Sequence, residues 1–179
     1  MLSLGSGHRT NKKPPRKIYQ QLTKAAPPQN EFGPYNIEGG TLTFTAGQTK
    51  DGSSDWLKVQ YPNANQTNIS GVSRRNLLSD NEAGPGIKYR FTFDLFLETA
   101  ADWTQGAGNP TVTTKVYFGG ETHQVEVTPD QTVSIDTGVK KIMAKGQNDL
   151  LIYFDAPNDL PEAQSVFYIK NFTFTNTLC

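Results

Sequence analysis

The sequence is poor in the residues that build metal-bound or disulfide-linked folds. Its 179 residues include one cysteine, Cys179, and two histidines, His8 and His123. One thiol cannot form a disulfide within the chain, and so few cysteines and histidines provide no zinc-ligand spacing. We therefore expect neither a metal nor a cofactor. A domain of this length can bury about two-thirds of its unfolded surface without either.

Long apolar runs are also missing. No stretch approaches the roughly 20 apolar residues that cross a bilayer. Near the start, Leu2 and Leu4 precede the basic residues instead of following them, which is the wrong order for a secretory signal. We expect a soluble protein that is made in the cytoplasm and does not contact a membrane.

Catalytic signatures are absent as well. The sequence has no Gly-x-Ser-x-Gly motif, and His123 stands on an expected hairpin strand with no identifiable nucleophile. A glycosidase needs two converging carboxylates, and no pattern brings together the acids on strand faces or in loops, which are Asp94, Asp155, Asp159 and Glu162. We expect a protein that is not an enzyme, with a structural role for His123.

Charge is distributed unevenly along the chain. Residues 1–35 contain six Lys or Arg and one acid, whereas residues 36–179 contain eleven bases and sixteen acids. The formal net charge of zero therefore combines a segment of +5 with a segment of −5. The sequence predicts an extended basic N-terminal arm over residues 1–35 and one folded domain over residues 36–179.

The arm itself divides into three pieces. Residues 1–7 are a short apolar hook that ends in glycines, and residues 8–17 are basic and contain Pro14 and Pro15. Residues 18–26 are expected to form about two helical turns, which Pro27 and Pro28 end. Nucleic acid, an acidic protein surface and plain solubilisation are the three interpretations. The arm has one aromatic residue, Tyr19, and no base-reading motif, so we expect no specific nucleic-acid recognition.

We favour docking of this arm on a protein partner, with apolar residues buried in the contact and bases steering the approach. The residues expected to make the contact are Leu2, Leu4, Arg9, Lys12, Lys13, Arg16, Lys17, Ile18 and Leu22.

From residue 36 onward the apolar residues recur with a period of two. The runs are short, rich in β-branched and aromatic residues, and bounded by Gly, Pro, Asn or Asp. The expected strands cover residues 41–45, 56–61, 88–97, 111–118, 123–127, 131–135, 149–154 and 167–174. Such a series with no long helix predicts an all-β fold, an antiparallel sandwich of the jelly-roll type.

Alternation along these strands also predicts the core. The side chains expected to point inward are Leu42, Phe44, Leu57, Val59, Tyr89, Phe91, Phe93, Leu95, Val116, Val125, Val127, Leu151, Tyr153, Ile169 and Phe174. The run Leu95-Phe96-Leu97 breaks the alternation, which indicates a bulge or a second buried face.

Two aromatic patterns stand out in the domain. One strand reads Gly-x-x-Tyr-x-Phe-x-Phe, starting at Gly86, and the last strand reads FYIKNFTF over residues 167–174. These patterns resemble the jelly-roll carbohydrate-binding modules, whose last strand usually carries Asp-Asn between hydrophobic residues. The resemblance covers about residues 36–177 and implies that fold, with weak glycan contact. Lys170 stands where the family tends to have Asp, which weakens the case for the structural calcium that the family often binds.

Two tryptophans are candidates for a glycan or subunit contact, because sugar-binding sandwiches stack exposed aromatic rings on sugars. Trp56 begins an expected strand, and Trp103 lies in the polar, Gly-rich stretch 100–109. The alternatives are a core position for Trp56 and a loop-anchoring role for Trp103.

The opening residues, Leu2-Ser3-Leu4-Gly5, resemble the segment with which tailed-bacteriophage virion proteins carrying jelly-roll or lectin-like domains often begin. Together with the arm, this resemblance implies a structural protein located in the virion. Its partners would be the major capsid protein or another virion protein, and further copies of itself. Capsid decoration or cementing is the first interpretation. A neck, tail or fibre-associated attachment protein and a soluble carbohydrate-binding module are the alternatives.

Overall fold

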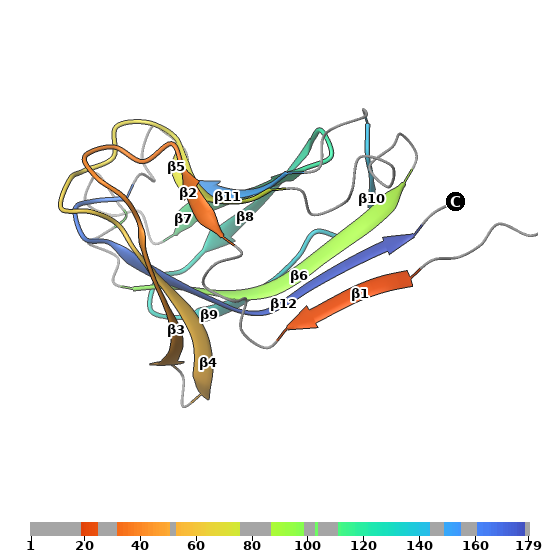
Figure 1. The fold of residues 1–179 in the computed structure, drawn as a ribbon, viewed down its shortest axis with the longest axis horizontal. Coiled ribbons are helices and arrows are strands. Elements are labelled where there is room, and N and C mark those ends of the chain that lie inside the picture. The colour runs from red at the N-terminus through yellow and green to blue at the C-terminus, as the bar shows by residue number, and fades with distance from the viewer. Residues whose placement is uncertain are drawn as a thin grey trace, which may run out of the picture.

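Two antiparallel sheets pack face to face (Figure 1). The computed structural model describes residues 19–24, 32–50, 53–75, 87–98, 103, 111–143, 149–154 and 161–177, with residues 19–24, 53–54 and 176–177 described by their backbone alone. In this part of the chain no helix is long and apolar enough to cross a membrane. The predicted all-β antiparallel sandwich is confirmed.

Seven strands form the first sheet, called sheet A. They are β1 (Tyr19–Lys24), β3 (Thr43–Lys50), β4 (Ser53–Gln60), β6 (Lys88–Leu97), β9 (Thr132–Asp136), β10 (Lys140–Lys141) and β12 (Val166–Thr177). Strand β12 is its centre. It pairs with β6 along one edge, while β4 and β1 lie end to end along the other.

Five strands form the second sheet, called sheet B, in the spatial order β2-β5-β11-β7-β8. Their bounds are β2 (Gly33–Tyr35), β5 (Ser70–Arg74), β7 (Val112–Phe118), β8 (Glu121–Val127) and β11 (Leu150–Phe154). The inner faces of the two sheets enclose one apolar core that contains most of the residues expected there, with Phe44 and Val125 partly buried at its margin.

Strand β11 corrects the predicted core. Leu151 and Tyr153 were expected to point inward, but they lie on the outer face of sheet B and are only half-buried. The buried residues are instead Leu150, Ile152 and Phe154, each 0% exposed. The local sequence LLIYF contains no charged residue to mark the wet face, so both phases of the alternation fit it equally well.

The segment 18–26 corrects a second expectation. Residues 19–24 form a strand, not a helix, and pair with Phe172–Thr177 of β12. A two-turn helix is marginal by itself because few of its backbone groups are bonded. Pairing with an open strand edge gives hydrogen bonds to alternate residues along the whole segment. Leu22 of the predicted contact set lies opposite Phe174. The remaining arm contacts, Leu2 to Ile18, lie outside the described residues.

The run Leu95-Phe96-Leu97 breaks the alternation because sheet A has a second buried surface there, on its outer side. Phe96 points to the outer side of sheet A and packs in a small cluster with Trp56, Val166 and Tyr168. The ammonium groups of Lys50 and Lys170 cover these rings, at 4.9 Å from the centroid of Tyr168 and 4.4 Å from that of Trp56. The pairing of β6 is regular there, and the register shift occurs in β12 between Lys170 and Thr173.

Candidate functional site

An open depression of about 340 Å³ lies on the outer face of sheet B. Aromatic and aliphatic side chains dominate its lining, which consists of Tyr35, Ile69, Tyr117, Thr122, Leu151 and Tyr153. We call this set of residues the tyrosine groove. Contiguous exposed apolar surface of this kind on a small domain commonly marks a binding site.

Strand register places these side chains in two rows that cross the sheet. In the first row Tyr35 lies opposite Gly71, Gly71 opposite Tyr153, and Tyr153 opposite Lys115. Gly71 has no side chain to separate the two tyrosines, and their ring centroids approach to 6.2 Å although their strands are not neighbours. The first row is therefore aromatic at one end and polar at the other.

The second row lies two residues further along the strands. In it Leu151 is opposite Tyr117, and Tyr117 is opposite Thr122. Diagonal neighbours on adjacent strands are separated by about 7–8 Å between Cα atoms, so Tyr153 and Tyr117 are close enough to contact a single ligand.

Hydrogen bonds hold the rim of the groove. Asn36, which directly follows β2, has a positive φ of 52° and donates from Nδ2 to the carbonyl of Ile69 at 2.6 Å. The Glu38 carboxylate accepts the backbone N–H of Thr67 at 2.9 Å and the side-chain amide of Asn68 at 2.7 Å. These bonds, from Asn68 first and then Thr67, lower the pKa of Glu38.

Gln66 fixes the same loop from inside. Its side chain is 0% exposed and forms two hydrogen bonds with the backbone of Glu38, accepting from the N–H at 2.8 Å and donating to the carbonyl at 3.1 Å. As a result Ile69 is held at the edge of the groove with 36% of its surface exposed.

The described residues of the groove do not form a catalytic site. None of the described side chains that line it is a carboxylate or a histidine. Among the described residues no three His, Cys, Asp or Glu side chains lie close enough together to hold a metal ion. Of the four acids considered above, Asp94 accepts hydrogen bonds from Ser134 at 2.6 Å and Asn171 at 2.7 Å, and Glu162 does not line the groove. Asp155 and Asp159 lie outside the described residues.

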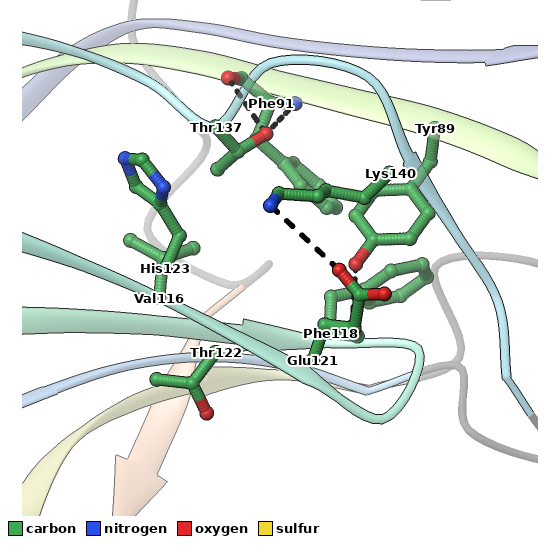
Figure 2. A pocket seen from close by; sticks show the side chains of 9 residues that line it. All are labelled: Tyr89, Phe91, Val116, Phe118, Glu121, Thr122, His123, Thr137 and Lys140. Atoms are coloured by element: carbon green, nitrogen blue, oxygen red, sulfur yellow. Dashed lines mark hydrogen bonds and ion pairs between the residues drawn. The ribbon is translucent and has the colours of Figure 1, made fainter.

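His123 lies away from the groove, on the inner side of β8 at the open edge between the sheets. Figure 2 shows it in a narrow cleft with Tyr89, Glu121 and Lys140. Lys140 and Glu121 form an ion pair at 3.8 Å. The phenol of Tyr89 donates to the carbonyl of Phe118 at 2.6 Å, and burial raises its pKa. The cleft has about 10 Å³ of free volume, which is room for at most about one water molecule.

Neither tryptophan presents a ring to a ligand. Trp103 is 0% exposed, packs 4.4 Å from the ring centroid of Phe154, and donates from Nε1 to the carbonyl of Glu98 at 3.0 Å. Trp56 is also 0% exposed and donates to the carbonyl of Lys50 at 3.0 Å. The burial of Trp56 matches the alternative of a core position, and that of Trp103 matches the alternative of a loop anchor. Neither indole ring is exposed for the glycan contact that was considered.

The residues of the groove were missed by sequence reasoning. Tyr153 was assigned to the core, and Tyr35 and Tyr117 were not singled out. The sequence feature that could have identified Tyr117 is the alternation along β7, which puts Tyr117 on the polar face with Thr113 and Lys115. An aromatic side chain on a face that is otherwise polar is a candidate contact residue.

Comparisons with known proteins identify the fold. No protein-family model matches the sequence, and no curated protein matches it significantly. A solved xylan-binding domain of carbohydrate-binding family 22 is 16% identical, with a TM-score of 0.52 over 92% of this chain and 97% of that one. The C-terminal family 22 module of Clostridium thermocellum Xyn10B is 17% identical, with a TM-score of 0.50 over 81% of this chain and 84% of that one.

This likeness establishes the fold, which is a jelly-roll β-sandwich. Both of these similar proteins are carbohydrate-binding modules, and at 16% and 17% identity the likeness concerns the fold alone, so the absence of enzymatic activity remains a prediction. Neither is a virion protein, and nothing in these comparisons indicates a phage origin. The capsid partner, the self-association and the virion location remain predictions.

Proposed function

We propose that this chain is a carbohydrate-binding module and that the tyrosine groove is its ligand site. The observation that carries the proposal is the gathering of three tyrosines, with Leu151 and Ile69, in one open depression. Aromatic rings bury the apolar C–H faces of sugar rings, and phenolic hydroxyls donate and accept hydrogen bonds with sugar hydroxyls.

The shape of the groove favours an extended ligand. Its tyrosines stand on β2, β11 and β7, so it spans three inter-strand spacings, or about 14 Å. The depression is open rather than enclosed, and a chain of sugars can lie across the strands and continue beyond it. A linear polysaccharide therefore suits the groove better than a monosaccharide.

The polar end of the groove adds groups that can form hydrogen bonds with a glycan, but no groups that could cleave it. Lys115 and Gln124 continue the row that begins at Tyr35 and Tyr153. With no carboxylate pair in the groove, bound glycan is held and not cleaved. The similar structures support this choice of ligand class, since one of them is a xylan-binding domain, and xylan is the first polymer to test.

The test is binding of the full chain to a panel of neutral polysaccharides, measured by affinity electrophoresis and calorimetry. Tyr153→Ala and Tyr117→Ala should each weaken binding about tenfold, equivalent to about 1.4 kcal/mol, because each removes one ring from the contact. Met143→Ala is the matched control, since Met143 is 61% exposed and lies outside the groove. Binding that is insensitive to both tyrosine substitutions, or absent for every polymer, would overturn the proposal.

A further inference from the structure

A group of cationic side chains lies at one end of sheet A, on the sheet opposite the tyrosine groove. Lys88 at the start of β6 is directly opposite Lys141 of β10, and Arg90 follows two residues along β6. Like charges directly opposite each other on antiparallel strands are destabilising. Neither lysine forms an ion pair among the described residues.

A hollow of about 170 Å³ adjoins these lysines. Lys88, Arg90, Val139 and Thr175 line it together with part of Tyr89. Val139 is 66% exposed, so its methyl groups are accessible to a ligand at the hollow. The hollow therefore combines positive charge, a hydroxyl group and an apolar contact.

The guanidinium of Arg90 is fixed at the wall of this hollow. It forms a two-point pair with the carboxylate of Asp136, in which Nε donates to Oδ1 at 2.8 Å and Nη2 donates to Oδ2. Hydrogen bonding to Asp136 raises the pKa of Arg90. A planar guanidinium held in this way is pre-organised for a second contact.

Protection of a sheet edge explains only part of this arrangement. Lysines on a short edge strand discourage pairing with other chains, which accounts for Lys140 and Lys141 on β10. Lys88 lies on β6, between β10 and β12, where no free edge needs protection. The hollow beside it extends from Val139, next to the edge strand β10, across β6 to Thr175 of β12.

Strand β1 also begins at this end of the sheet. The first residue of β1, Tyr19, lies opposite Thr177, and Thr177 lies opposite Lys88. In the sequence Tyr19 is preceded closely by Arg16 and Lys17. The lysines Lys88 and Lys141 stand at this end of a domain whose residues 36–179 carry a formal net charge of −5.

We propose that the hollow formed by Lys88, Arg90, Val139 and Thr175, with Lys141 beside it, is a second binding site, which takes an anionic sugar of an acidic polysaccharide. The lysines balance the negative group, Arg90 and Thr175 donate hydrogen bonds to it, and Val139 contacts the apolar face of the sugar ring. The site is independent of the tyrosine groove because it lies on the other sheet.

The experiment compares two polymers that share a backbone and differ in charge. Polygalacturonate and its methyl-esterified form are titrated against the full chain, at about 20 mM and about 200 mM salt. The charged polymer should bind, with an affinity that falls at the higher salt, and the esterified polymer should bind much more weakly. Chondroitin sulfate tests whether the recognised group is a sulfate, and binding of either charged polymer with this salt dependence supports the proposal.

Two variants locate the contact. Lys88→Gln combined with Lys141→Gln should weaken binding about fivefold or more, since two exposed charge contacts are lost. Lys58→Gln, a matched lysine on the outer face of β4, should leave it unchanged. Thermal melting should show that the double variant stays folded, because the change removes a repulsive pair. Equal binding of the two polymers, equal losses in Lys58→Gln, or tighter binding of duplex DNA than of either acidic polysaccharide would overturn the proposal.

Discussion

The burial of Trp103 leads to a sharp prediction about Trp103→Ala. The ring is 0% exposed and lies 4.4 Å from Phe154, 6.0 Å from Tyr61 and 6.1 Å from Phe167, measured between centroids. Truncating a buried aromatic residue to alanine costs about 3–5 kcal/mol. The carbonyl of Glu98 also loses its hydrogen bond from Nε1, so we expect a loss of about 4 kcal/mol.

Urea denaturation measures this loss. For a denaturant slope of about 2 kcal/mol per molar, the unfolding midpoint should fall by about 2 M. This is a large part of the total stability of about 5–15 kcal/mol that is usual for a domain. Tyr153→Ala serves as the comparison, because its half-buried ring lies in the groove and its loss should cost clearly less, about 1–2 kcal/mol.

The two variants should therefore separate stability from binding. Trp103→Ala should unfold easily yet retain glycan binding at temperatures where it is folded, while Tyr153→Ala should stay stable and bind weakly. A Trp103→Ala protein that is as stable as the parent but no longer binds polysaccharide would refute this reasoning and return Trp103 to the role of a ligand contact.

Three further predictions concern a charge, a glycine and the rim of the groove. Hydrogen bonds from Arg90 and from the backbone of Gly138 lower the pKa of Asp136 to about 2, from an ordinary value of 3.8. A pKa lowered by folding stabilises the protein above pH 3.8, and that stabilisation is lost as the pH falls through about 2. Urea midpoints at these two pH values should therefore differ less in Asp136→Asn than in the parent, and equal differences would contradict the reasoning. Gly71→Ala should destabilise the protein by about 1–3 kcal/mol in a thermal melt, because the added Cβ would lie 2.1 Å from the carbonyl oxygen of Ile152 in β11; an unchanged melting temperature would be inconsistent with this close approach. Glu38→Gln should speed amide hydrogen exchange at Thr67 and weaken glycan binding, and it should leave global unfolding unchanged. The reason is that one amide oxygen cannot replace both carboxylate oxygens in the bonds to Thr67 and Asn68. Unchanged exchange at Thr67 would show that Glu38 does not hold this loop.

The strands that sequence reasoning placed correctly carry polar residues between their apolar ones. In β6 Arg90, Thr92 and Asp94 alternate with Tyr89, Phe91 and Phe93, so both the element and its buried face follow from the period of two. The predicted bounds 88–97 agree with β6 as the structure has it.

The strands that were missed lack such a signal. Strand β5 reads SGVSR, with a glycine and two serines in five residues, and its close approach to β11 at Gly71 depends on the neighbouring backbone. Strand β1 exists because β4 pairs only with Val166–Ile169 and leaves the rest of that edge of β12 available. Neither the close approach at Gly71 nor the available edge of β12 can be predicted from a short stretch of sequence.

The sequence by itself determined the fold class and most of the core, because alternation and turn residues act locally and recur along the chain. Only the tertiary structure decided which residues of β11 are buried, and therefore which of them line the tyrosine groove. Ile152 is buried because its register sets it between Val72 and Val116, which turns Leu151 and Tyr153 outward. A strand that is apolar throughout does not specify which of its faces is buried. Its neighbours in the sheet do, since they fix the register in which it pairs.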